Sequence, residues 1–223
     1  MHLEAVRKRI ALACKRAGRD PGEVGIVAVT KTHPVSAVAE AVGEGLKDVG
    51  ENRVQEALAK QDEWTGPEVR WHLIGHLQRN KAKQAVGRFA LIHSLDSIRL
   101  ADALDQAAAA QGITQDVLVQ VNVAGEEQKS GASVDEASSL VRHAQGLKHL
   151  ALKGLMTMAP LTDDVSVQRA TFAGLRDLRD LLELAGAKLP VLSMGMSGDF
   201  EAAVEEGATL LRLGTVLFGE RQP

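Results

Sequence analysis

The sequence predicts a single α/β domain that folds as a (β/α)8 barrel, or TIM barrel, with one extra helix at its N-terminus. Three observations support this fold class. Short apolar runs alternate with longer segments of helical periodicity through most of the 223 residues, and this alternation indicates parallel strands joined by helices. Eight such units fit within the chain, which suits a compact barrel. The turn after the first run, "VTKTHP", has no glycine, whereas a doubly wound sheet, the alternative, usually has a glycine-rich first turn.

The elements follow one another in a regular order. A helix is expected over residues 1–18, because the apolar positions from Leu3 to Ala17 have helical spacing. The apolar runs expected to form strands are residues 25–30, 47–51, 70–75, 89–95, 116–123, 151–157, 190–195 and 209–214. The helical patterns between and after them are residues 35–45, 52–64, 78–88, 97–112, 133–146, 166–186, 199–208 and 215–221. No linker or repeat interrupts the series, so we expect one domain over residues 1–223, with the barrel at 24–221.

Composition narrows the class of protein. The formal net charge is −3 and no basic run stands out, which argues against a nucleic-acid partner. Cys14 is the single cysteine, so no internal disulfide can form, as is typical of a reducing cytoplasm. The N-terminus lacks the apolar core of a signal peptide, and no run approaches the ~20 apolar residues of a membrane span. We expect a soluble, cytoplasmic protein with no nucleic-acid, membrane or metal partner.

The predicted barrel places certain polar residues on one face. Residues at the C-terminal ends of the strands, and in the loops that follow, share the face on which binding and catalytic sites of such barrels lie. The residues at these ends are Lys31, Glu51, Asn52, His76, Asn122, Met156, residues 193–197 and residues 212–215. We expect functional side chains to collect there.

Lys31 ends the first apolar run, "VGIVAVTK". Desolvation at a strand end favours a neutral lysine amine, the form that attacks a carbonyl carbon to make a Schiff base. The alternative is a lysine at the rim that reaches water or pairs with a carboxylate such as Glu51. The first strand alone leaves both interpretations open.

Two loops near the C-terminus indicate a phosphate site. "SMGMSGDFEAAV" and "RLGTVLFG" each carry glycine and a hydroxyl residue where a strand hands over to a helix. Such turns direct N–H groups and hydroxyls at an anion, and the loops after strands 7 and 8 often bind phosphate in these barrels. The alternative is that Ser197 only caps a helix. A Schiff-base lysine that faces a phosphate pocket fits pyridoxal 5′-phosphate.

Six segments carry a resemblance to a known family. They are "VAVTKTHP", "VGENRVQEA", "WHLIGHLQRNK", "NVAGEEQKSG", "GLMTMAP" and "LSMGMSGDFEAAVEEGATLLRLGTVLFGER". In this order, over residues 25–221, they resemble the signature segments of the pyridoxal phosphate homeostasis protein family. That family is similar to the N-terminal barrel of alanine racemase, a fold type III pyridoxal phosphate domain. Its members bind the cofactor without an established turnover.

The resemblance implies roles for individual residues. Lys31 would form the Schiff base with the cofactor, and Ser197, Gly214 and Thr215 would hold its phosphate. Arg212 would lie beside the pyridine nitrogen, where a permanent cation disfavours protonation of that nitrogen and weakens the ring as an electron sink.

Other positions match the family less closely. The resemblance places Asn52 and His76 on the pocket wall, although His76 is equally well explained as a structural histidine at a helix start. His33 stands where many relatives have a second lysine, and Arg53 stands where an aromatic residue is common. Lys129 is a competing lysine in the polar loop "EEQKSG", where a solvated side chain is the simpler interpretation.

Three functions follow, in descending order of support. The first is a protein that stores, buffers or delivers pyridoxal phosphate, with pyridoxal-phosphate-dependent apoenzymes as recipients and the monomer as its working form. The second is a racemase-like fold type III enzyme with an unknown substrate. Alanine racemase uses a tyrosine as its second base, and this chain has no tyrosine, which argues against that mechanism. The third is a cofactor-free Schiff-base aldolase, supported only by fold-level analogy.

Overall fold

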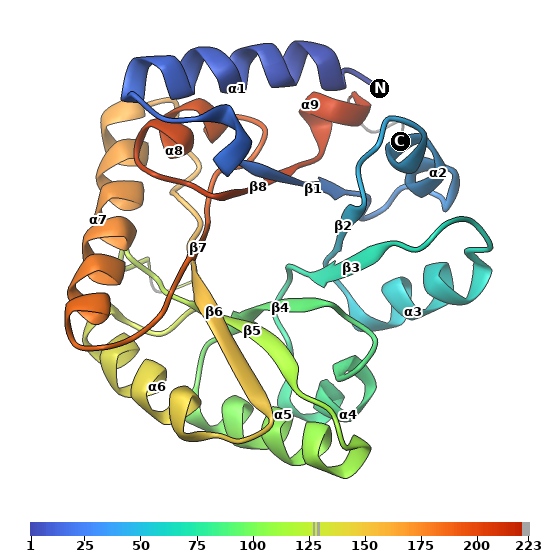
Figure 1. Ribbon diagram of the computed structural model, residues 1–223, viewed down its shortest axis with the longest axis vertical. Helices are drawn as coiled ribbons and strands as arrows, with labels where there is room; N and C mark the ends of the chain where they lie inside the picture. The colour runs from blue at the N-terminus through green and yellow to red at the C-terminus, as the bar shows by residue number, and fades with distance from the viewer. Residues whose placement is uncertain (127, 129, 220–223) are drawn as a thin grey trace.

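Eight parallel strands close into a barrel in the computed structural model, which describes residues 1–126, 128 and 130–219 (Figure 1). Each strand pairs with the next along the chain, and the last pairs with the first, in register at Ala28 and Leu213. The strands are β1 (Gly25–Val29), β2 (Asp48–Glu51), β3 (Arg70–Leu73), β4 (Leu91–Leu95), β5 (Gln115–Gln120), β6 (Leu150–Met156), β7 (Val191–Ser193) and β8 (Leu210–Leu213). This topology confirms the predicted fold class. Lys129 and residues 220–221, which were part of the predictions, lie outside the described residues.

The helices surround the barrel, as Figure 1 shows. They are α1 (Leu3–Ala17), α2 (Ser36–Gly43), α3 (Val54–Glu63), α4 (Ala82–Ala85), α5 (Ile98–Gln111), α6 (Val134–Gly146), α7 (Val165–Leu184), α8 (Phe200–Glu205) and α9 (Thr215–Phe218), with short 3₁₀ turns at η1 (Pro21–Glu23) and η2 (Arg79–Lys81). In the part of the chain that is described, no helix has both the length and the apolar character needed to cross a membrane.

Local sequence explains where several elements begin and end. At the start of α6, Ser133 and Glu136 form a capping box, in which each side chain accepts a bond from the other residue's N–H. At the end of α1, Gly18 adopts a left-handed conformation with φ 66°, which glycine allows without steric cost. The strand β5 ends earlier than predicted because the chain leaves β6, and Asn122 N–H instead donates to Ala132 O at 2.8 Å.

Two cores stabilise the fold. The larger lies between the barrel and its helices and includes Phe172, Leu175 and Phe200, all fully buried. The smaller consists of Leu91, Leu118 and Met156.

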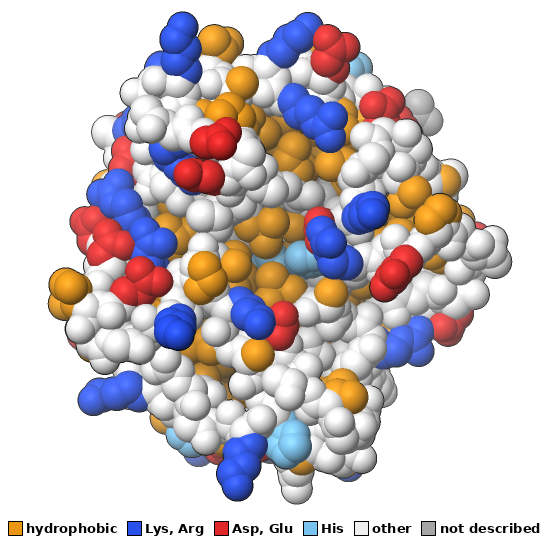
Figure 2. Space-filling view, viewed as in Figure 1, with side chains coloured by type: hydrophobic (Ala, Val, Ile, Leu, Met, Phe, Trp, Pro, Cys, Tyr) orange, Lys and Arg blue, Asp and Glu red, His pale blue; other side chains and the backbone are white. Residues whose placement is uncertain are grey.

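The barrel interior also buries polar side chains. These residues, all with at most 5% of their surface exposed, are His72, His93, Ser193 and Arg212. Figure 2 shows the surface hollowed near the middle of the barrel, with apolar and histidine side chains at its floor. The interior is therefore a mixed polar and apolar space.

Candidate ligand-binding site

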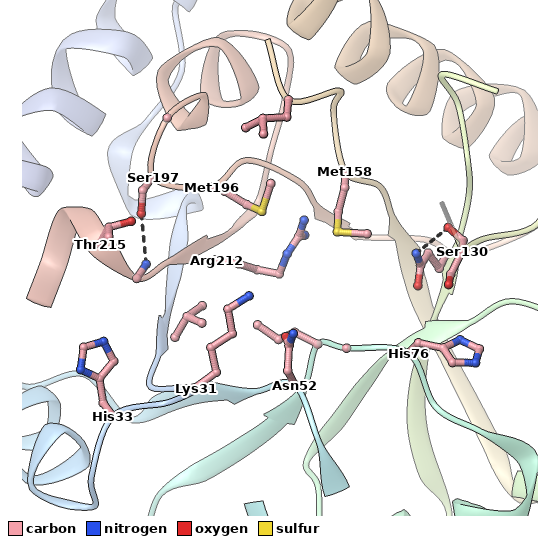
Figure 3. A pocket seen from close by; sticks show the side chains of 17 residues that line it. Lys31, His33, Asn52, His76, Ser130, Met158, Met196, Ser197, Arg212 and Thr215 are labelled. Carbon is pink, nitrogen blue, oxygen red and sulfur yellow. Dashed lines mark hydrogen bonds between the residues drawn. The ribbon is translucent and has the colours of Figure 1, made fainter. Parts of the chain in front are cut away.

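A cavity of about 420 Å³ opens at the C-terminal ends of the strands. Its size lies within the ~300–1,000 Å³ that small-molecule sites occupy. It is lined by Val29, Lys31, His33, Asn52, Ile74, Gly75, His76, Gln120, Ser130, Met158, Leu161, Met196, Ser197, Gly198, Arg212, Gly214 and Thr215. The structure thus brings together all seven residues that the sequence predicted for a cofactor site, as Figure 3 shows for six of them by name.

Lys31 lies two residues beyond the end of β1, and its side chain extends into the cavity (Figure 3). The next residue, Thr32, has φ 65°, a left-handed conformation that is rare and strained for a β-branched residue. The turn is closed by a hydrogen bond from His33 N–H to Thr30 O, 3.0 Å long. Backbone strain of this kind often occurs beside functional residues, because the surrounding structure must hold it in place.

Glu51 is the carboxylate that the sequence indicated as a possible partner for Lys31. Its carboxylate lies in the layer between the barrel and α3, where Oε1 accepts hydrogen bonds from Lys60 Nζ and Thr30 Oγ1, each 2.6 Å long. Glu51 is fully buried and does not line the cavity. Of the other strand-end residues, Asn122 and Met156 are also absent from the cavity wall.

The loops after β7 and β8 are joined by Ser197. Its Oγ accepts hydrogen bonds from the N–H groups of Gly214 and Val216, each 3.2 Å long. The helix α8 is preceded by Asp199, so Ser197 is not its cap, which was the alternative interpretation. Because the hydroxyl accepts two bonds, its own hydrogen is left to donate. Thr215 lies beside Ser197 on the same side of the cavity (Figure 3).

Two glycines allow the walls of the cavity to approach closely. A Cβ on Gly75 would lie 2.2 Å from the carbonyl oxygen of Asn52, so only glycine fits beside that backbone. Gly195 has φ 92°, and a Cβ there would lie 2.6 Å from the Cβ of Ala203. The loop after β7 can therefore pack tightly on α8, which fixes the residues that follow it.

Arg212 forms the floor of the cavity. Nη1 donates to Ser193 Oγ at 2.7 Å, and Nη2 donates to the carbonyl oxygen of Thr157 at 2.8 Å. Burial lowers the pKa of Arg212 to about 10, while the charge of Asp199 acts in the opposite direction. The guanidinium therefore stays cationic at neutral pH. Figure 3 shows the side chains of Met158 and Met196 close to it.

The two histidines that line the cavity face other groups. His76 Nδ1 is 3.3 Å from Asp96 Oδ2, and its side chain is 52% exposed; Figure 3 shows the ring turned away from Lys31. The ring of His33 packs against Phe218, with centroids 5.4 Å apart. Both residues lie at the rim of the cavity rather than at its centre.

Comparison with known proteins identifies the family. A family model described as "Alanine racemase, N-terminal domain" matches residues 1–222. A relative from Aquifex aeolicus (strain VF5), named pyridoxal phosphate homeostasis protein, is 45% identical over 99% of this chain and 97% of its own. This chain belongs to the pyridoxal phosphate homeostasis protein family.

Other members of the pyridoxal phosphate homeostasis protein family agree. The one from Pseudomonas aeruginosa is 44% identical over 99% of this chain and 94% of its own. The solved structure of PipY from Synechococcus elongatus PCC7942, described as having pyridoxal phosphate (PLP) bound, is 39% identical, with a TM-score of 0.83 over 96% of this chain and all of that one. The family predicted from the six sequence segments is thereby confirmed.

Sequence reasoning missed several wall residues of this family member. These residues are Ile74 and Gly75, which directly follow β3, and Gln120, which is the last residue of β5. Gln120 Nε2 donates to Ser130 O at 2.7 Å, which brings the loop after β5 to the cavity. A polar residue that interrupts an apolar strand near its C-terminal end was the available signal for Gln120.

Proposed function

We propose that this protein binds pyridoxal 5′-phosphate in the cavity described above and serves in the intracellular homeostasis of that cofactor. The observation that supports this most directly is that one cavity holds a primary amine at Lys31, two hydroxyls of adjoining loops, and the buried guanidinium of Arg212. Relatives named for this role and the PipY structure support it independently.

The chemistry of the donor set fits the cofactor. When bound, pyridoxal phosphate supplies an aldehyde that reacts with amines and an aromatic ring that delocalises negative charge. The Nζ of Lys31 is the amine that would attach to the aldehyde carbon, with loss of one water molecule. Ser197 and Thr215 would donate hydroxyl hydrogens to the phosphate, beside the backbone of Gly214 and Gly198. An added Cβ on Gly198 meets nothing within 4 Å, so this side of the cavity has room.

Arg212 favours retention of the cofactor over chemistry on it. If Arg212 lies beside the ring nitrogen, as the family resemblance implies, its charge would disfavour a proton on that nitrogen, and an unprotonated ring would draw less electron density from a bound substrate. A two-base mechanism also needs a second proton carrier within hydrogen-bond reach of the substrate. The chain has no tyrosine, and the histidines of the wall face Asp96 and Phe218. We therefore place storage, buffering or delivery ahead of catalysis.

The decisive experiment is attachment at Lys31. The wild-type protein, Lys31→Ala and Lys31→Arg are mixed with pyridoxal phosphate, absorption spectra are recorded, and borohydride reduction is followed by peptide mapping. We expect a visible band and a label on Lys31 in the wild type, and neither in the two variants, because neither side chain can form the linkage. Lys188→Ala, an exposed lysine away from the cavity, is the control. A label on Lys129 in place of Lys31 would contradict the assignment.

Catalysis is tested separately. The same donor set suits a fold type III enzyme, and such an enzyme should exchange the Cα hydrogen of one amino acid for deuterium. We expect no exchange above a trace across a broad panel of amines. Rapid exchange that is lost in Lys31→Ala would make this protein an enzyme.

The working form and recipients complete the proposal. We propose that the protein acts as a single-domain monomer in the cytoplasm and passes its ligand to pyridoxal-phosphate-dependent apoenzymes. The single cysteine, Cys14, is buried, which is consistent with a reducing compartment. Sedimentation of the loaded protein and the rate at which it activates an apoenzyme, compared with free cofactor at equal concentration, test the two statements.

A further inference from the structure

A chain of hydrogen bonds crosses the interior of the barrel. It begins at Arg212 of β8, whose Nη1 is 2.7 Å from Ser193 Oγ of β7. Ser193 Oγ is 2.9 Å from His93 Nδ1 of β4, across the lumen and 100 positions away in the sequence. The chain continues through His72 of β3, whose Nδ1 is 2.9 Å from His93 Nε2 and whose Nε2 is 2.9 Å from Asp48 Oδ1. Asp48 begins β2, so the chain ends at the opposite mouth of the barrel.

The chemistry of its two ends gives the chain a direction. A guanidinium has only hydrogen-bond donors, and an ionised carboxylate has only acceptors. Burial would raise the pKa of Asp48, but hydrogen bonds from His72 and Arg70 outweigh it and lower the pKa to about 2, so Asp48 is ionised at neutral pH. Arg212 must therefore donate to Ser193, and His72 must donate its Nε2 hydrogen to Asp48.

The two histidines between these ends have only two consistent arrangements. Burial, with the nearby charges of His72 and Arg212, keeps the pKa of His93 well below its ordinary value, so His93 is neutral and carries one ring hydrogen. If His72 is neutral, His93 donates from Nε2 to His72 and accepts from the Ser193 hydroxyl at Nδ1. If His72 is protonated, it donates to His93 Nε2, and His93 donates from Nδ1 to Ser193. The direction of both hydrogen bonds made by His93 depends on that one proton.

The neutral arrangement suits a buried cation. Every donor then points from Arg212 toward Asp48, so the negative end of each dipole faces the guanidinium, and aligned bonds of this kind strengthen one another. In the reversed arrangement Ser193 accepts from both Arg212 and His93, and a second positive charge is present on His72. Arg212, which lines the cavity, then lies near dipoles whose positive ends point toward it.

We propose that Ser193, His93, His72 and Asp48 are positioning residues for Arg212, and that protonation of His72 at one mouth of the barrel reverses the bonds of His93 and Ser193 and changes the environment of Arg212 at the other. The charged and titratable groups around His72 are Asp48 of β2, Arg70 of its own strand and His93 of β4, with Glu68 near Arg70 and Arg212 beyond His93. Because Arg212 lines the cavity assigned to pyridoxal phosphate, the effect on that ligand rests on the proposed function.

The ligand-free protein decides the proposal. Imidazole ¹⁵N spectra and the side-chain ¹⁵N resonance of Arg212 are recorded between pH 5 and 8.5. We expect His93 to carry its hydrogen on Nε2 at high pH and on Nδ1 after acidification, with the Arg212 resonance moving at the same pH. Asp48→Asn, which removes the negative charge at the end of the chain, should change the pH at which the His93 hydrogen moves.

Variants of Ser193 test whether the hydroxyl couples His93 to Arg212 or whether Ser193 only fills space. Ser193→Ala should leave His93 reversing without any movement of the Arg212 resonance, and Ser193→Thr, which keeps the hydroxyl, should restore the joint movement. His143→Gln is the control, because His143 pairs with Asp102 at the protein surface, away from the barrel interior. The proposal is overturned if His93 carries its hydrogen on Nδ1 throughout, or if the Arg212 resonance responds equally in Ser193→Ala.

The effect on the ligand is measured separately, in the protein with pyridoxal phosphate bound. With pyridoxal phosphate bound, its absorption maximum should move at the pH at which His93 reverses in the same sample, and not in Ser193→Ala. If no ligand band forms, the proposed function is wrong. The proposal about the hydrogen-bond chain is still tested by the resonances of the ligand-free protein. A band that forms but ignores the reversal would overturn the coupling to the ligand and leave the binding function standing.

Discussion

The space inside the barrel and the layer around it are built on different principles. Around the barrel, apolar side chains such as Phe172 and Leu175 make up most of the packing between strands and helices, although the Glu51 carboxylate is also buried there. Inside, a small apolar cluster around Leu118 and Met156 shares the lumen with a chain of polar groups that runs from Arg212 to Asp48. The difference shows that the outer layer carries the stability of the fold, whereas the interior is organised around the floor of the cavity. Mutations in the two regions should therefore fail in different ways.

Truncation in the outer layer should have the largest effect on stability. Phe172 is fully buried on α7, and Phe172→Ala should lower the free energy of unfolding by about 3–5 kcal/mol, the usual cost of emptying such a site. Urea unfolding measures this. Leu184→Ala on the same helix is the control, since Leu184 is 88% exposed and its loss should cost under about 0.5 kcal/mol. A loss below about 1 kcal/mol for Phe172→Ala would contradict the role given to the outer layer.

Interruption of the inner chain should cost less and should not be additive. His93→Leu removes one hydrogen-bond partner from Ser193 and one from His72, which should cost about 1–3 kcal/mol. The double variant with His72→Leu also removes the His72 ring, one of the two groups that lost a partner. Its cost should therefore be smaller than the sum of the costs of the two single variants. A double-mutant cycle by urea unfolding measures the difference. Simple additivity would show that the two histidines act independently, contrary to the chain described here.

Asp48 links the inner chain to the pH dependence of stability. Its pKa is lowered to about 2 in the folded protein, against ~3.9 in an unfolded chain. Because the folded-state pKa is the lower one, the contribution is fully present above about pH 4 and is lost as the pH falls toward 2. After allowance for solvent near this mouth, it is worth about 1–2 kcal/mol. The stability difference between wild type and Asp48→Asn, measured from pH 5 to pH 2, should shrink by that amount; a constant difference would refute it.

An ion pair on the outermost surface should have the smallest effect. Arg9 pairs with Glu201 and lies over the ring of Phe200, 4.5 Å from its centroid, where α1 covers α8. Arg9→Ala should cost about 0.5–1 kcal/mol, and less at high salt. The control is Lys8→Ala, which removes a pair with Glu4 that is exposed on both sides. A cost that does not change with salt would assign the effect to the contact with Phe200 rather than to the charges.

The difference between the barrel interior and the layer around it also explains which features the sequence could predict. The outer layer produces a periodic pattern of apolar residues in the sequence. The eight strands and most helices could therefore be predicted within a few residues. Lys31 and Ser197 were predicted because a barrel brings strand ends to one face. The inner chain was not predicted, since His93 and Ser193 meet only when the barrel closes across 100 positions of sequence. The signal that remained was one histidine within each of the apolar runs "RWHLIG" and "FALIHSL", where His72 and His93 stand in place of an aliphatic side chain.

Closure of the barrel also has a consequence for the concentration that this protein can reach in a cell. A carrier binds its ligand one for one, so its capacity equals its own concentration, and a useful store must be abundant. Abundant β-proteins risk joining at exposed sheet edges, where unpaired N–H and C=O groups recruit other chains. Here β1 is bonded to β8 as well as to β2, and the ring of described strands presents no such edge. The topology that gathers the cavity residues at one mouth thus also leaves the described strands with no edge at which another chain could pair.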